Sequence, residues 1–144
     1  MAANKYDKNI VTLPFRQTKE GALFATGADV LGGLSLNVIY ACAYKTGITG
    51  LSTKPHVHAY DEAVYFIGSD PYHLDELGAE VEISIGELGQ EEKYTFDKPS
   101  VLIAPAGLYH CPIVTKKIDR PYVCMAVSLT GEREDDPPPP PIKN

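Results

Sequence analysis

The segment His-Val-His-Ala-Tyr-Asp-Glu, residues 56–62, places two imidazoles and two carboxylates within seven residues. Successive side chains on a strand point to opposite faces, so residues of equal parity share a face. His56, His58 and Glu62 have equal parity, whereas Asp61 is expected to point the other way. The segment therefore predicts three metal-binding side chains on one face, with Glu62 rather than Asp61 as the carboxylate.

The residues after this segment favour a strand. Ala-Val-Tyr-Phe-Ile at 63–67 is apolar, aromatic and β-branched, and Gly68 ends the run like a turn. A helix is the competing interpretation, because His58 and Glu62 are also four residues apart. Pro55 and the residue types argue against the helix. A polar surface strand without any metal is the simpler alternative to a binding site.

A second segment supplies a further imidazole. An apolar run at 99–104 leads into Pro105-Ala106-Gly107, which has the residues of a tight turn, and His110 opens the next stretch. The chain has four histidines, and three of them lie in these two segments. Three imidazoles and one carboxylate suit a divalent transition metal such as Fe, Mn, Zn or Ni.

Together the two segments resemble the two motifs of the cupin superfamily. The first motif has two histidines separated by one residue, then a glutamate and a later glycine; the second reads Pro-x-Gly-x-x-His. The matching residues are His56, His58, Glu62 and Gly68, and then Pro105, Gly107 and His110. The resemblance covers about residues 30–130. Pro99 and Val114 stand where the second motif often has Gly and Asn, which puts the subgroup in doubt more than the ligands.

The resemblance implies a fold, a ligand set and an assembly. The fold would be all-β, a double-stranded β-helix, or jelly roll, closed into a barrel. His56, His58, Glu62 and His110 would hold one metal ion. A homodimer would form through exchange of N-terminal strands or through sheet packing. Fold alone does not settle activity, since the superfamily includes dioxygenases, isomerases, decarboxylases, lyases and non-catalytic proteins.

Strand signals continue along the rest of the chain. Further strands are expected at 10–13, 34–44, 79–85, 93–96 and 121–130, and no segment shows a convincing helical period. Residues 1–130 would form the barrel with an N-terminal strand extension. Residues 131–144 would form an acidic tail, whose five prolines at 137–141 favour polyproline II.

Composition limits the classes of partner and compartment. The net charge of −6 argues against nucleic acid, and no apolar stretch is long enough to span a membrane. The N-terminus lacks the apolar core of a signal peptide, and the chain has three cysteines, an odd number. Both features predict a reducing, cytoplasmic location. Cys42 and Cys124 are expected to be buried, and Cys111 is expected to point away from the metal by strand parity.

The ligand set suggests a chemistry. Four protein ligands on a six-coordinate ion leave two positions, at which a small substrate with two oxygens, such as a hydroxy-ketone or hydroxy-acid, would chelate and be activated. Tyr60 and Lys54 share the ligands' parity and are candidate catalytic residues; the alternatives are a packed aromatic and a surface lysine. An isomerase, decarboxylase, lyase or dioxygenase is therefore predicted. A non-catalytic metabolite-binding or structural cupin, such as one with a closed zinc site, is the alternative.

Overall fold

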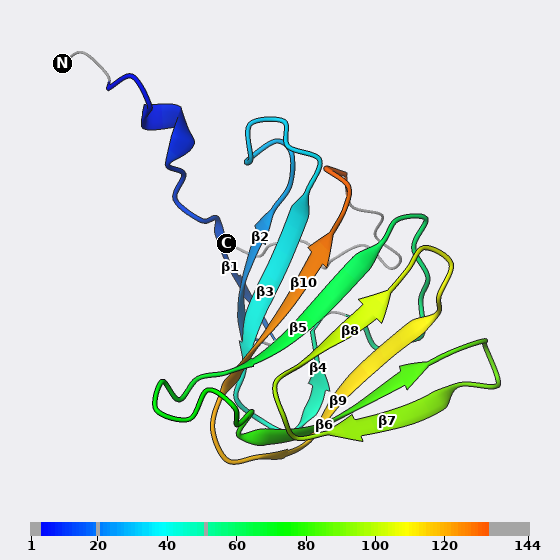
Figure 1. Ribbon diagram of the computed structural model, residues 1–144. Coiled ribbons are helices and arrows are strands. Elements are labelled where there is room, and N and C mark those ends of the chain that lie inside the picture. Colours follow the sequence, from blue (N-terminus) through cyan, green and yellow to red (C-terminus); the bar gives the residue numbers. More distant parts are fainter. Residues whose placement is uncertain (1–3, 20, 51, 133–144) are drawn as a thin grey trace.

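The computed structural model describes residues 4–19, 21–50 and 52–132, and these form two antiparallel sheets (Figure 1). The larger sheet has the order β1-β2-β3-β10-β5-β8 and the smaller β4-β9-β6-β7. The larger sheet comprises β1 (Phe15–Thr18), β2 (Gly21–Thr26), β3 (Asn37–Ala43), β5 (Glu62–Gly68), β8 (Ser100–Ala104) and β10 (Tyr122–Ser128). The smaller sheet comprises β4 (Gly47–Thr49), β6 (Ala79–Ile85), β7 (Glu92–Phe96) and β9 (His110–Ile118).

Alternation along the strands places the apolar core between the sheets. On β5, Val64 and Phe66 are buried while Tyr65 is exposed, and on β6, Val81 and Ile83 are buried. The largest fully buried side chain, Tyr122 of β10, donates or accepts hydrogen bonds through its hydroxyl with two buried threonines, Thr49 and Thr115. The expected all-β fold is therefore confirmed, with the core on the inner faces of the two sheets.

Three expectations from the sequence need correction. The described strands do not join the two sheets into a closed barrel; they remain two separately hydrogen-bonded sheets, as in a jelly roll that is open at its edges. Residues 10–13 are extended but unpaired, and the first strand begins at Phe15. Residues 57–61 do not belong to a strand, because β5 begins only at Glu62 and His56 makes an isolated bridge to His110.

Helix is almost absent from the described residues. A single 3-10 turn, η1 (Asp7–Asn9), lies on the N-terminal segment, which extends away from the two sheets (dark blue in Figure 1). In the part of the chain that is described, no helix has the length and apolar character that crossing a membrane requires.

Candidate metal centre

The structure brings His56, His58, Glu62 and His110 together in space. Glu62 is the first residue of β5 and His110 the first of β9, so each side chain comes from the start of a strand in a different sheet. One nitrogen or carboxylate oxygen from each of the four residues lies within 4.8 Å of all the others. Donors that bind one ion at about 2.0–2.2 Å each lie no more than about 4.4 Å apart, so binding requires only a small contraction.

Main-chain hydrogen bonds tie the two segments together. His56 and His110 exchange both of their main-chain bonds, each with an N···O distance of 3.0 Å. The N–H of Gly107 donates to the main-chain oxygen of His58 at 3.0 Å. The Asp61 carboxylate accepts from the N–H of Ala106 at 2.9 Å. Asp61 is thus turned away from the four ligands, as its parity predicts, and holds the turn that carries His110.

Two outer contacts orient the donors. Nδ1 of His110 lies 2.9 Å from the main-chain oxygen of Leu108. A carbonyl can only accept, so Nδ1 carries the proton and the lone pair lies on Nε2. Nε2 is 3.3 Å from Oε1 of Glu62, and the Ser128 hydroxyl donates to Oε2 of the same carboxylate at 2.9 Å. Such partners fix the direction of a ligand before the ion binds.

The protonation states suit a cation. Burial, together with the neighbouring His110 and His58, lowers the pKa of His56 from 6.5 to about 4. Burial alone would raise the pKa of Glu62, but the close approach of His110, the hydrogen bond from Ser128 and the nearby His58 hold it below its usual value. At neutral pH the cluster therefore offers a neutral His56 imidazole and an ionised Glu62 carboxylate, the forms in which these groups bind metals.

Among the residues that the structure describes, two buried side-chain nitrogens lack a hydrogen-bond partner. These are Nδ1 of His56 and Nε2 of His110. Buried polar atoms are nearly always satisfied, and an exception requires a reason such as a bound ion. Both atoms belong to the four-residue cluster, so a divalent ion would satisfy them at once. The residues present therefore fit a metal.

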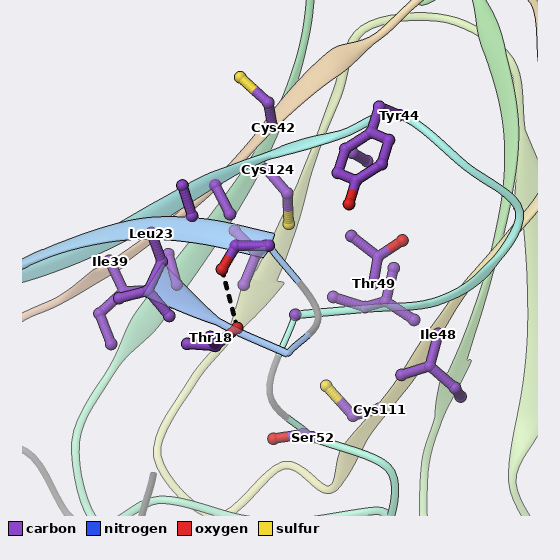
Figure 2. Close-up of a pocket in the computed structure, with 18 of the residues that line it drawn as sticks. Thr18, Leu23, Ile39, Cys42, Tyr44, Ile48, Thr49, Ser52, Cys111 and Cys124 are labelled. Carbon is purple, nitrogen blue, oxygen red and sulfur yellow. Dashed lines mark hydrogen bonds between the residues drawn. The ribbon is translucent and has the colours of Figure 1, made fainter. Parts of the chain in front are cut away.

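The cluster borders a pocket that residues of both sheets line. His56, His58 and Glu62 belong to its lining, whereas His110 does not. The remaining lining comes from β1, β2, β3, β4, β5, β9 and β10 and from the loops on either side of β4, and it is mostly apolar (Figure 2). Near the hairpin between β1 and β2, the Thr18 hydroxyl donates to the main-chain oxygen of Gly21 (Figure 2). A ligand in this pocket would reach the three exposed donors directly.

Cys111 departs from the sequence prediction, because its side chain is buried and lines the pocket. Strand β9 contains a bulge here: Ile83 pairs with Ile113 and Ile85 with His110, so β9 has one extra residue between these pairs. Cys111 has a φ of 80°, and a bulge of this kind re-aims a side chain. Two consecutive residues, His110 and Cys111, consequently both face the interior.

The three cysteines have different environments. None forms a disulfide. Cys42 is exposed, contrary to the prediction, because alternation on β3 turns it to the outer face; its side chain points away from the other two thiols in Figure 2. Burial raises the pKa of Cys111 and of Cys124 to about 12, and Glu62 contributes to both shifts. Both pocket thiols are therefore protonated at neutral pH.

The two candidate catalytic residues lie beside the pocket rather than in its lining. Tyr60 stacks on His58 with ring centroids 4.6 Å apart and an interplanar angle of 12°. Lys54 is exposed. Neither belongs to the residues that line the pocket. Sequence reasoning had not identified Ser128 or Asp61 as supports of the site, because their contacts depend on strand register.

No protein-family profile and no curated protein sequence matches this chain. Solved structures do. A mutant of Bacillus subtilis oxalate decarboxylase superposes with a TM-score of 0.59 and 15% identity, over 85% of this chain and 29% of that one. Another structure of that enzyme, concerned with its Mn(II) centres, superposes with a TM-score of 0.59 and 14% identity, over 88% of this chain and 31% of that one. Lactobacillus farciminis oxalate decarboxylase in a formate complex superposes with a TM-score of 0.59 and 13% identity, over 83% of this chain and 32% of that one.

This chain spans less than a third of the length of each of these proteins, and identities near 15% establish the fold alone. Oxalate decarboxylases are cupins. The shared architecture and the convergence of the four motif residues agree with the resemblance found in the sequence. The chain therefore has the cupin fold.

Proposed function

We propose that this protein is a mononuclear metal-binding cupin that acts as an enzyme on a small oxygenated metabolite. His56, His58, Glu62 and His110 would hold one divalent transition metal. This proposal rests on the observation that three of these residues line an open, largely apolar pocket. A purely structural zinc site is normally closed by its protein ligands, whereas this cluster faces space in which a second molecule can bind.

A bound divalent ion would supply Lewis-acid stabilisation of a developing enolate or alkoxide. The chain's own groups would prepare for that chemistry. The Ser128 hydroxyl holds the Glu62 carboxylate in place, with His110 beside it. The aliphatic walls would exclude water and strengthen the electrostatic interactions of the site. Isomerisation, decarboxylation, elimination and ring cleavage by dioxygen all fit this arrangement, and the fold likeness makes decarboxylation one of the first reactions to assay.

The experiment is to load the protein with Mn(II) and measure the relaxation of solvent protons. An open site gives enhanced relaxation from exchanging water, and a chelating oxygen donor such as lactate lowers it by displacing that water. A Mn(II)-loaded protein with no exchanging water and no response to chelators would overturn the enzyme proposal. That result would favour the alternative, a structural or non-catalytic cupin.

Within this proposal Tyr60 has a positioning role, because it stacks on His58 rather than entering the pocket. Replacing Tyr60 with Phe keeps the ring and should leave metal affinity within about twofold. Replacing it with Ala removes the stacking and should weaken Mn(II) binding several-fold. A loss of turnover in Tyr60→Phe with unchanged metal binding would instead support the direct catalytic role expected from the sequence. For Lys54 the direct role also stays a prediction, which Lys54→Met tests in the same assay.

We also propose a homodimer that packs through the outer face of the larger sheet. Side chains in one register row of a sheet share a face. One such row crosses all six strands and is entirely apolar or aromatic: Phe15, Phe24, Tyr40, Met125, Tyr65 and Val101. Phe15, Tyr65 and Val101 are exposed. An uncharged face of this extent is typical of an interface, and a second copy would present the same face about a twofold axis.

Sedimentation tests the dimer. The wild-type chain should sediment as a dimer at micromolar concentration, and Tyr65→Glu should sediment as a monomer, since it would bury a charge in the contact. A monomeric wild type would contradict this proposal without affecting the metal site. The three free thiols support a reducing compartment, and we propose the cytoplasm; thiol titration of the freshly isolated protein checks this, with fewer than three free thiols as the contrary result.

A further inference from the structure

The inner face of the larger sheet forms an apolar floor that begins directly beside the metal cluster. Glu62 pairs with Ser128 at the end of this floor. The next inward-facing row includes Val64, Ala126 and Ile39. The row after that includes Cys124, Ala41 and Leu23. All six residues line the pocket. The rows span four residues from Glu62, or roughly 13 Å at the rise of a strand.

Small side chains create the space above this floor. Ala41 and Ala126 lie at central strand positions, where a larger aliphatic residue would fill the gap between the sheets. The opposite wall includes Cys111 and Ile113 of β9 and Ile48 and Thr49 of β4. Figure 2 shows Cys124, Cys111 and Ile48 around the same space. The floor and this wall therefore enclose room for an apolar group.

Charged side chains are few in the pocket lining. Glu62 is the one carboxylate among the described lining residues. Among the described lining residues Lys45 is the one permanent cation, and it is exposed, with Nζ 5.7 Å from the centroid of the Tyr44 ring. Tyr44 itself is exposed beside Gly21 in the turn between β1 and β2. The walls beside the donors thus offer no counter-charge to a second anionic group of a ligand.

We propose that the substrate carries one oxygen-chelating head, neutral or singly charged, on an apolar body several carbons long. This inference rests on the proposed metal site and adds the substrate class. The head would bind at the His56, His58 and Glu62 end. The body would lie on the Val64, Ala126 and Ala41 floor. A 2-oxo or 2-hydroxy acid with an alkyl or aryl substituent has this chemistry, whereas a compact dianion such as oxalate does not.

The test is a chain-length series measured by calorimetry on the Mn(II)-loaded protein. The probes are straight-chain 2-oxo acids from pyruvate to 2-oxooctanoate, with oxalate as the compact dianion. Each methylene placed on the floor should raise affinity about three- to fourfold, so 2-oxohexanoate should bind more than tenfold more tightly than pyruvate. Affinity that does not change with chain length, or oxalate as the tightest ligand, would overturn the inference.

Floor variants locate the effect. Ala126→Val and Ala41→Val narrow the pocket without touching a metal ligand. Each should reduce the advantage of 2-oxohexanoate over pyruvate to below threefold while Mn(II) and pyruvate affinities stay within about twofold. Ala25→Val is the matched control, because Ala25 pairs with Ile39 in the same sheet but does not line the pocket. Unchanged chain-length dependence in both folded floor variants would contradict the assigned location.

The two proposals fail in different ways. If the wild-type protein binds no Mn(II) or other divalent ion, the proposed metal function fails before any acid is added. If it binds the ion and the series is flat, the metal function stands and the substrate class is wrong. The wild-type series is decisive even if one of the valine variants does not fold.

Discussion

Nε2 of His110 lies 3.3 Å from Oε1 of Glu62, at the junction between the two sheets. The two side chains begin strands β9 and β5, and neither strand pairs with the other. Leu108 fixes the proton of His110 on Nδ1, and Ser128 holds the other oxygen of Glu62. The pair is therefore arranged to present a lone pair and a negative charge to the same point.

Ser128→Ala tests the support of the carboxylate. The substitution removes the hydroxyl that donates to Glu62 at 2.9 Å. Loss of such an outer partner typically lowers metal affinity by about 10- to 100-fold. Competition with a chromophoric chelator measures the change. Ser35→Ala, at an exposed loop position, is the control and should bind as the wild type does; equal affinities in the two variants would show that Ser128 does not orient Glu62.

Asp61→Ala tests the tie between the two motifs. The change removes the acceptor for the N–H of Ala106, so the turn that positions His110 loses a charge-assisted hydrogen bond. We expect a loss of about 1–3 kcal/mol in the free energy of unfolding and a several-fold loss of metal affinity. Urea titration and chelator competition measure the two effects. Asp61→Asn retains an acceptor oxygen and should recover part of both; no difference between Ala and Asn would contradict this role.

The stability of the metal-free protein should fall as the pH falls from about 6.5 toward 4. The folded pKa of His56 is about 4 against an ordinary value of 6.5, so in this window the unfolded chain binds a proton that the folded chain excludes. The lowered pKa of Glu62 acts in the same direction at more acidic pH. Thermal unfolding with a chelator present, from pH 8 to 4.5, measures the trend. His56→Asn should flatten it, and a wild-type Tm independent of pH would contradict the burial of His56.

Replacing each of two motif glycines with alanine should lower the free energy of unfolding by a different amount. A Cβ on Gly68 would collide with the main-chain oxygen of Glu76, whereas a Cβ on Gly107 would enter open space but at a φ of 89°. Gly107→Ala should cost about 1–2 kcal/mol for its left-handed backbone. Gly68→Ala forces backbone apart and should cost more, about 3 kcal/mol. Urea unfolding ranks the two variants, and the reverse order would show that the β5 to Glu76 approach is looser than described.

Much of the site followed from spacing and residue type. Equal parity predicted His56, His58 and Glu62 on one side, and the structure brings them together even though residues 57–61 are not a strand and bend at 59–60. The strand at 79–85 was predicted from its alternation, and the apolar run at 99–104 contains β8. The oxygen of Leu108 and the hydroxyl of Ser128 could not be foreseen, since they depend on turn geometry and on the pairing of β10 with β5.

Cys111 shows why parity fails at an irregularity. Alternation counted from His110 directs Cys111 outward, but the bulge opposite Ile83 and Ile85 adds a residue to β9 and restores inward direction at Cys111 and Ile113. No residue in the local sequence announces this bulge, because position 111 has a positive φ without being a glycine. The register between strands, which a single sequence does not reveal, therefore determines which side chains of β9 line the pocket.

Elemental analysis of the protein purified without added metal tests the central claim most directly, with His58→Ala as the paired sample. His58 contributes a donor to the cluster, and its Nε2 atom lies 3.6 Å from Oε2 of Glu62. The wild type should contain, or take up on reconstitution, about one equivalent of iron, manganese, nickel or zinc, and the variant should lose most of it. No divalent ion in either protein, even after reconstitution, would contradict the assignment of His56, His58, Glu62 and His110 as a metal centre.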